Sequence, residues 1–235
     1  MGIEKLSSSG LKDTFVQRIQ GMILSGELLV GSKLPPERTL AEQMHISRTV
    51  VNSGLAELAG QGFLEVRPRQ GTYVADYRRC GNLDTLTAAV EHTGGALSRD
   101  EIRSIFEVRR ALEHLAADRA IRYASNEALE RLRVPLARLA AAASDGEAAE
   151  AAFTFRHELA LAGGNTVLPL IYCSFKEPLV ALWVRFCGRY GNLPLVRNAE
   201  SLYTFLKARD ADGAVCWINA YLERMISGSQ QIYEP

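Results

Sequence analysis

The order of short segments in the first third of the chain constrains the fold more than any other feature. Apolar side chains recur at helical spacing over residues 15–23, and Gly26 then predicts the end of a first helix. Pro36 favours the first turn of a second helix that runs to Met44, because its fixed φ suits that position. Two short helices therefore precede residue 45.

A third helix and a hairpin complete this pattern. Ser47 is a good N-cap, and the helix that follows it places three apolar side chains on one face: Val51, Leu55 and Leu58. Gly60 and Gly62 end it, and residues 63–67 and 72–75 read as two strands around the turn at 68–71. A helix, a helix-turn-helix and a hairpin are the elements of a winged helix-turn-helix domain.

The remainder of the chain has a different character. Strand signals vanish after Asp76, and helical periodicity recurs at 84–93, 99–123, 126–143, 146–162, 167–190, 194–209 and 212–226. We therefore predict a mainly α protein in two parts. A winged helix-turn-helix occupies 1–76, a linker 77–83, and an all-α bundle of six to seven helices 84–235.

Local signals mark several helix ends in this second part. Ser98 with Glu101 has the pattern of a capping box, and Ser125 is an N-cap. Gly163 ends the helix predicted over residues 146–162. Three prolines should start or kink helices rather than lie inside them: Pro135, Pro169 and Pro178.

Composition limits the possible classes of protein. With 47% hydrophobic residues among 235, the chain is too apolar to be disordered and can bury two modest cores. Its 27 basic and 27 acidic residues cancel, so a nucleic-acid partner must be argued from local pattern. The four cysteines include no CxxC pair, which disfavours a zinc knuckle or a secreted disulfide framework: Cys80, Cys173, Cys187 and Cys216. Without an export signal or membrane span, a cytoplasmic location is expected.

The third helix carries side chains suited to reading DNA. Arg48, Thr49 and Asn52 should project opposite its apolar face. Arginine can bind the guanine edge bidentately, asparagine can do the same on adenine, and threonine can meet a phosphate or a thymine methyl. Any one of them could be a solvated surface residue, whereas the ordered set favours a DNA-binding face. Further contacts are expected from the preceding helix and the wing: Arg38, Arg67, Arg69, Gln70 and Gly71.

These segments resemble the DNA-binding domain of the GntR family of bacterial regulators. The resemblance lies in residues 31–41, 47–51, 62–66 and 71–74. It implies DNA contacts by Arg38, Ser47, Arg48 and Thr49 and by the wing at 69–71. Family members commonly have arginine where this chain has Asn52, so the resemblance does not specify the operator sequence.

The helical part is similar to the FCD-type effector domain of the FadR branch of that family. Residues 106–113, His157 with 164–165, and residues 208–212 carry this similarity. Many such domains hold a divalent metal through one aspartate and three histidines. Here Phe153, Ala199 and Tyr221 stand at the other three positions, so the resemblance predicts a sensor without a metal or other cofactor.

Arg109 stands out without reference to any family. It shares the apolar stripe of its helix with Ile105 and Ala116, where an unpaired charge is unfavourable. Its partner is either an anionic effector or a carboxylate of the protein, such as Glu113 one turn on. His157 is either a hydrogen-bonded core histidine or an effector contact. The predicted effector pocket consists of these two with two aromatic residues: Arg109, Phe153, His157 and Tyr221.

Together these features predict a sequence-specific transcription regulator. We expect a homodimer that binds operator DNA as a repressor, with activation as the alternative, and that is controlled by a small organic acid. An anion with an apolar body suits the predicted pocket. No nucleophile-base pair is recognisable, so no enzyme is expected. The alternatives are a DNA-anchored helical domain with an enzymatic or scaffolding role, and constitutive DNA binding with an inactive sensor.

Overall fold

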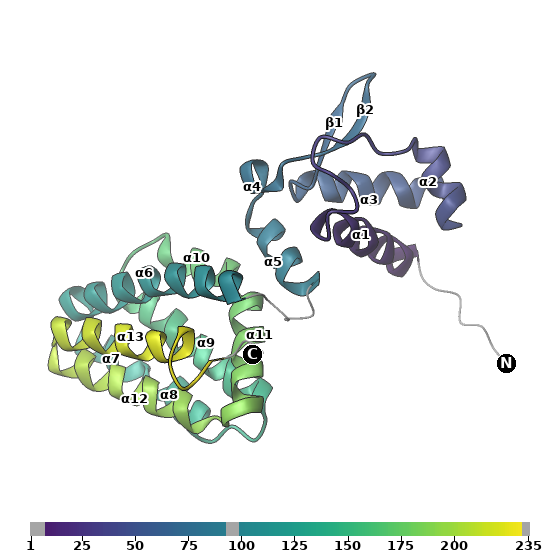
Figure 1. Ribbon diagram of the computed structural model, residues 1–235. Coiled ribbons are helices and arrows are strands. Elements are labelled where there is room, and N and C mark those ends of the chain that lie inside the picture. Colours follow the sequence, from purple (N-terminus) through teal and green to yellow (C-terminus); the bar gives the residue numbers. More distant parts are fainter. Residues whose placement is uncertain (1–7, 93–98, 232–235) are drawn as a thin grey trace. The chain divides into compact units, whose positions relative to one another are not determined.

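The computed structural model describes residues 8–92 and 99–231 (Figure 1). The chain divides into two compact units, Met1–Gly94 and Gly95–Pro235. The first is a winged helix-turn-helix and the second a helical bundle, which confirms the predicted fold class.

The first unit contains α1 (Ser8–Leu24), α2 (Glu37–Met44), α3 (Arg48–Gly60), β1 (Leu64–Arg67), β2 (Gly71–Val74), α4 (Tyr77–Cys80) and α5 (Leu83–His92). The two strands are antiparallel, with Leu64 opposite Val74, and form the wing. As predicted, Ser47 caps α3, because its hydroxyl accepts a hydrogen bond from the Val50 N–H at 3.2 Å. His45, in the left-handed region with φ 54°, ends α2 and allows the tight turn.

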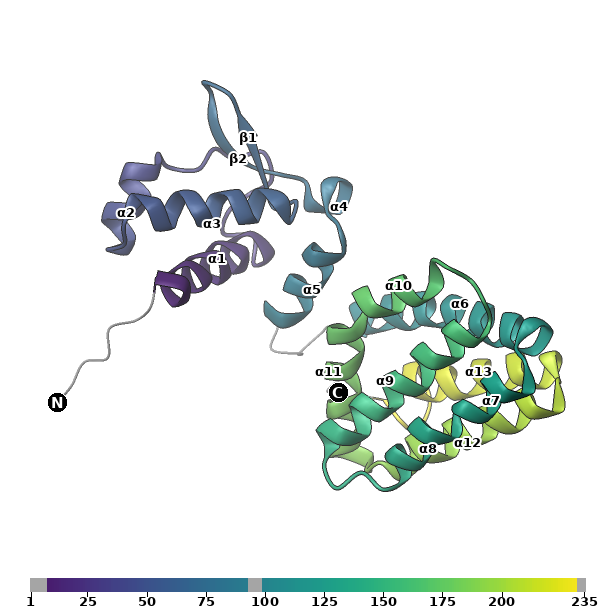
Figure 2. The same ribbon diagram turned by 180° about the vertical axis from the view of Figure 1, so that it is seen from behind.

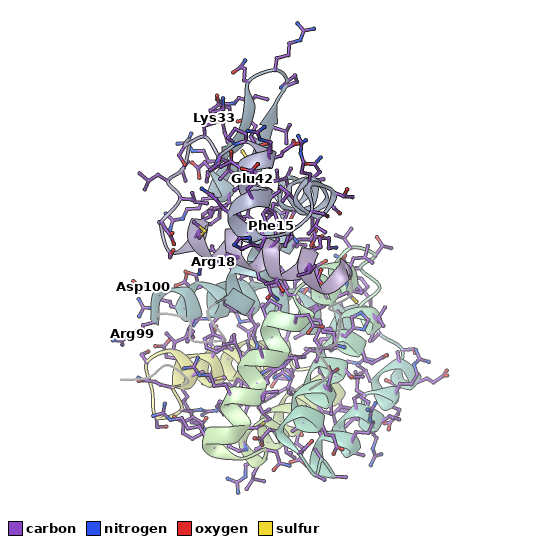
Figure 3. The ribbon with its side chains drawn as sticks, turned by 90° about the vertical axis from the view of Figure 1, so that its right-hand side faces the viewer. Phe15, Arg18, Lys33, Glu42, Arg99 and Asp100 are labelled. Atoms are coloured by element: carbon purple, nitrogen blue, oxygen red, sulfur yellow. The ribbon has the colours of Figure 1, made fainter. Side chains whose placement is uncertain are left out.

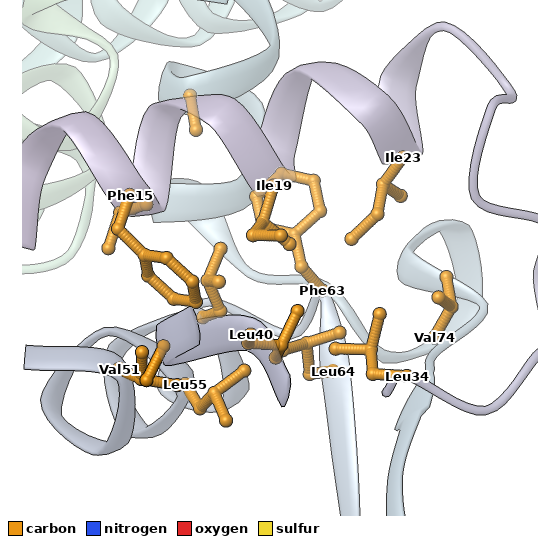
Figure 4. Packing of buried hydrophobic residues seen from close by; sticks show 14 residues of the cluster. Phe15, Ile19, Ile23, Leu34, Leu40, Val51, Leu55, Phe63, Leu64 and Val74 are labelled. Carbon is orange, nitrogen blue, oxygen red and sulfur yellow. The ribbon is translucent and has the colours of Figure 1, made fainter. Parts of the chain in front are cut away.

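One apolar core holds this unit together (Figure 4). Phe15, Ile19 and Ile23 of α1 face buried side chains of α2, α3 and the wing. A Cβ on Gly54 would lie 2.4 Å from the Phe15 ring, so only glycine lets α3 approach α1 this closely. The core thereby fixes α3 with its opposite face outward.

Helix α5 belongs to the first unit, whereas we expected residues 84–93 in the helical bundle. Ala88 joins the core beneath α1, and the Asn82 side chain donates to the Gly60 carbonyl oxygen at 3.0 Å. The Thr85 hydroxyl also donates to the Gln61 carbonyl oxygen. Residues 77–83, our expected linker, include α4 and the first residue of α5. The burial of Ala88 and the two hydrogen bonds to the end of α3 hold α5 in the first unit, which explains the difference.

The second unit consists of α6 (Arg99–Tyr123), α7 (Asn126–Arg131), α8 (Arg133–Ala140), α9 (Asp145–Ala162), α10 (Leu168–Ser174), α11 (Lys176–Tyr190), α12 (Leu193–Ala208) and α13 (Ala211–Ile226) (Figure 2). Helix α9 packs against α6, α8, α10 and α11 and is buried along much of its length. None of the helices in the described parts of the chain is long and apolar enough to cross a membrane.

Prolines account for the two places where one predicted helix is observed as two. The segment 126–143 breaks at Leu132 and the segment 167–190 at Phe175. In each case the new helix has proline, Pro135 or Pro178, as its third residue, where a missing N–H is tolerated. Ser125 caps α7 as predicted, by accepting from the Ala128 N–H at 3.0 Å. The predicted capping box at 98–101 involves Ser98, which lies outside the described residues.

Candidate nucleic-acid interface and effector site

The outer face of α3 presents the three side chains predicted to read bases. Arg48, Thr49 and Asn52 are all exposed, whereas Val51 and Leu58 on the opposite face are completely buried. Because Ser47 fixes the first turn, Arg48 and Thr49 project from the beginning of the helix. The sequence-based placement of this face is therefore correct.

A hollow of about 380 Å³ joins this helix to the wing and to the start of α2. Its polar lining brings together residues from all three elements: Lys33, Arg38, Arg48, Arg69, Gln70 and Thr72. Figure 3 shows Lys33 beside the hairpin, in agreement with an isolated antiparallel β-bridge between the backbones of Lys33 and Tyr73. Four basic side chains and one acidic one, Glu37, line the hollow, so its field favours an anion.

The tip of the wing holds an arginine in an unusual backbone conformation. The Gln70 N–H donates to the Arg67 carbonyl oxygen at 3.0 Å, which closes a turn across Pro68 and Arg69. Arg69 lies in the left-handed region with φ 63°, and Gly71 follows with φ 114°. A residue other than glycine or asparagine is disfavoured there by about 1–2 kcal/mol. The side chain of Arg69 is thus placed at the tip at some expense of stability.

The arginines of this surface differ in how strongly the protein itself holds them. Arg67 pairs with Glu65 at 2.7 Å and lies 4.3 Å from the centre of the Tyr73 ring. Arg38 pairs with Glu42 at 3.4 Å, and both side chains are well exposed. Within the described residues Arg48 and Arg69 make no ion pair. These last two are the most available for an outside partner.

Replacing Arg69 with asparagine should separate stability from DNA affinity. Asparagine tolerates the left-handed region, so we expect unfolding free energy to be unchanged or higher by up to about 1 kcal/mol. Loss of one phosphate contact should lower affinity similarly for all sequences and reduce the log-log salt slope by about 1. Urea unfolding and anisotropy titrations at several salt concentrations measure both. An unchanged salt slope would remove Arg69 from the interface.

The helical unit contains a buried ion-pair network around Glu113. Arg109 Nε donates to Glu113 Oε1 at 2.5 Å, and Arg156 Nε donates to the same oxygen at 2.9 Å. All three side chains are at most 2% exposed. Burial opposes each charge, yet Glu113 raises the pKa of Arg109, and the two arginines lower the pKa of Glu113. Two guanidinium groups and one carboxylate leave one net positive charge in the core.

Aromatic side chains enclose this network, and several buried polar atoms remain without a partner. The Trp183 ring centre lies 4.9 Å from Arg109 Cζ and 4.8 Å from Arg156 Cζ. Five buried atoms of the network and its aromatic surroundings have no hydrogen-bond partner among the described residues: Arg109 Nη2, Arg156 Nη2, Tyr172 Oη, Trp183 Nε1 and Tyr221 Oη. All five can donate, and each unsatisfied group costs about 1–3 kcal/mol. The surplus of donors and of positive charge suits an anion.

The four predicted effector residues fall into two pairs. Arg109 and Tyr221 belong to the buried network, with the ring 5.8 Å from the guanidinium carbon. Phe153 and His157 stack on each other, with ring centres 5.8 Å apart, and His157 Nε2 lies 3.3 Å from Cys173 Sγ. The structure thus brings together two of the predicted residues with Glu113, the internal partner that the sequence had suggested.

Sequence reasoning missed three members of the network: Arg156, Tyr172 and Trp183. The signal for Arg156 was present, because it lies on the apolar stripe of α9, one turn from both Ala152 and Ala160. A charged residue on the apolar stripe of its helix, the feature by which Arg109 was identified, would also have identified Arg156. Tyr172 and Trp183 have no comparable signal, because a buried aromatic residue is ordinary in a helical core.

The residues at the positions that the resemblance assigns to metal ligands do not fit a metal. Phe153 and Ala199 have no ligating atom, and the Tyr221 hydroxyl has a pKa raised by burial, so it stays a neutral phenol. His157 is the one remaining imidazole there. Among the described residues no group of three or more His, Cys, Asp or Glu side chains is placed to hold a metal ion.

Two family models match the chain. Residues 11–74 match "Bacterial regulatory proteins, gntR family", and residues 104–224 match "FCD domain". The first covers α1 to the end of the wing, and the second covers most of the helical unit, so the two matches follow the two parts of the fold.

Individual relatives agree with these models. LutR of Bacillus subtilis, an HTH-type transcriptional regulator, is 32% identical over 63% of this chain and 65% of its own length, slightly under two thirds of that relative. The HTH-type transcriptional regulator Rv0494 of Mycobacterium tuberculosis is 31% identical over 87% of this chain and 83% of its own. The solved structure of Lar, described as controlling expression of the Listeria monocytogenes agr system, shares the fold with a TM-score of 0.67 at 15% identity, covering 97% and 98% of the two chains. These relatives are regulators and not enzymes, and the chain belongs to the GntR family of bacterial DNA-binding transcription regulators, in the branch that carries an FCD domain.

Proposed function

We propose that this protein is a homodimeric, cytoplasmic repressor whose affinity for operator DNA is controlled by a small organic acid bound in its FCD domain. Repression is the simpler mode, because occupying the operator is sufficient to block transcription, whereas activation needs a further contact with the polymerase. Two copies are expected because a symmetric operator has two half-sites, and each half-site would bind the recognition helix, α3, of one copy.

The exposed face of α3 together with the basic hollow beside it carries the proposal. Arg48 and Asn52 are the side-chain types that bind guanine and adenine edges, and Thr49 lies between them. Arg38 and Arg69 flank this face from α2 and the wing, where they would contact phosphates. Ser47, Gln70 and Gly71 position the backbone, and Arg67 stiffens the wing through Glu65 and Tyr73.

The buried network supports an acidic effector. A carboxylate would neutralise the net charge left by Arg109, Arg156 and Glu113 and accept hydrogen bonds from the free Nη2 donors. Tyr221 and Trp183 provide apolar surface for the body of the acid. Phe153 and His157, on the same helix as Arg156, are proposed to complete the apolar side of the site.

Two experiments test the two halves of this function. Selection from a random duplex library should yield a palindromic operator, and failure to enrich any sequence would remove the DNA-binding role. Thermal-shift screening of organic acids should identify one that stabilises the wild type but stabilises Arg109→Gln far less. Equal stabilisation of both proteins would make Arg109 a purely structural partner of Glu113. Arg138→Gln, at an exposed site on α8, is the matched control.

A further inference from the structure

A cavity of about 290 Å³ lies between the beginning of α12 and the end of α13, two helices that pack side by side (Figure 1). Its walls include Arg197 and Asn198 of α12 and Trp217, Tyr221 and Arg224 of α13. Of the described residues, two arginines and no carboxylate line it. Its volume is close to the lower end of the range of small-molecule pockets, about 300–1,000 Å³.

Neither arginine is neutralised within the described part of the chain. Arg197 is exposed and makes no ion pair there. The Arg224 guanidinium carbon lies 5.3 Å from the centre of the Trp217 ring and 5.9 Å from that of Tyr221, so aromatic faces hold it in place of a carboxylate. By contrast, the neighbouring Glu223 is taken by Arg110 at 3.5 Å. Among the described residues, nothing therefore compensates the two positive charges of the cavity.

A buried amide adds a donor that has no acceptor. Asn198 is only 3% exposed, and the Trp217 Nε1–H donates to its Oδ1 at 2.9 Å. Because an indole N–H can only donate, the amide oxygen must face Trp217, and the NH₂ group is turned away from it. That NH₂ group is buried, and no described residue accepts a hydrogen bond from it. An anion in the cavity would supply the acceptor.

We propose that this cavity binds a small anion with two negative charges on oxygen, either a dicarboxylate or a phosphate monoester. Each guanidinium would take one charge, and Asn198 would donate to an oxygen between them. This site is additional to the network around Glu113, and its proposal does not depend on an acid being bound there. Tyr221 is a wall of the cavity and also belongs to that network, so α13 connects the two sites directly.

The two tryptophans of the chain allow this site to be observed separately. Trp217 lines the cavity, whereas Trp183 is buried between Arg109 and Arg156. Titrating the full-length protein with succinate or glycerol 2-phosphate should change its tryptophan fluorescence saturably, and the change should disappear in Trp217→Phe. The more effective of the two probes identifies the chemical class. Propionate, with one charge, should bind at least about tenfold more weakly.

Arginine variants decide whether the cavity causes the signal. Arg197→Gln and Arg224→Gln should each weaken binding of the effective probe by about tenfold or more, while Arg138→Gln leaves it unchanged. Arg197 is exposed, so its variant should fold normally. Equal affinity in wild type and both cavity variants, or no saturable signal from either dianion, would overturn the proposal. Because no DNA is present and Trp217 is the reporter, neither result bears on operator binding or on Arg109.

Discussion

Replacing Glu113 with glutamine should lower the free energy of unfolding of the helical unit by about 3–5 kcal/mol at pH 7, the range found when one partner of a buried ion pair is removed. Glutamine keeps the shape and one acceptor oxygen, but it leaves Arg109 and Arg156 buried without a counter-charge. The loss should be visible in urea unfolding followed by tryptophan fluorescence, since Trp183 lies against both guanidinium groups.

The pH dependence of this effect has a definite sign. The folded protein lowers the pKa of Glu113 below its ordinary value of 4.5, so its carboxylate contributes stability fully above that pH. As the pH falls through the lowered pKa, the folded protein must take up a proton and this contribution is lost. The stability difference between wild type and Glu113→Gln should therefore shrink in acid.

An exposed glutamate on the same helix provides the control for Glu113. Glu107→Gln should change stability by less than about 0.5 kcal/mol, as surface substitutions usually do. If Glu113→Gln were equally mild at pH 7, with no change in its difference from wild type in acid, the buried network would not be a charged one. The case for an anionic effector would then lose its physical basis.

Replacing Arg48 with alanine should remove sequence discrimination by the recognition helix, α3. A bidentate arginine-guanine contact contributes about 1–3 kcal/mol of discrimination, so the ratio of operator to scrambled-DNA affinity should fall by roughly 5–150-fold. Arg48 is exposed and makes no ion pair in the described structure, so the fold should be unaffected. Anisotropy titrations of both DNAs at one fixed salt concentration measure the ratio.

Arg138→Ala is the corresponding control, because Arg138 is also an exposed helical arginine but lies on α8 of the helical unit. It should leave both affinities unchanged. An Arg48 variant that lost affinity equally for operator and scrambled DNA would show that Arg48 contacts phosphate and not a base. A variant with unaltered binding to both would remove α3 as the reading helix.

Local chemistry explains why the sequence predicted the first unit well. Ser47 as a cap, the apolar face at Val51 and Leu58, and the turn after Pro68 depend on neighbouring residues, and all three occur where expected. The positive φ of Arg69 was not predicted, because arginine is among the residues that disfavour that region. Its position is determined by the hairpin and not by its own preference.

The network around Glu113 was harder to predict because it depends on contacts between distant helices. The Arg109 stripe on α6 indicated a buried charge and even named Glu113, but Arg156 is 43 positions from Glu113 along the chain. The packing of α9 against α6 brings them together, and a single sequence does not encode that pairing locally. The cavity at Arg197 and Arg224 likewise requires α12 and α13 to be adjacent.

The most direct test of the central claim is the operator dissociation constant of the full-length protein with and without an acid that stabilises it. The proposed function predicts that the acid raises this constant by about 5–150-fold, the usual range of allosteric coupling, and that Arg109→Gln abolishes the effect while still binding the operator. An operator affinity that no stabilising acid alters, or an equal effect of the acid on the Arg109 variant, would contradict it.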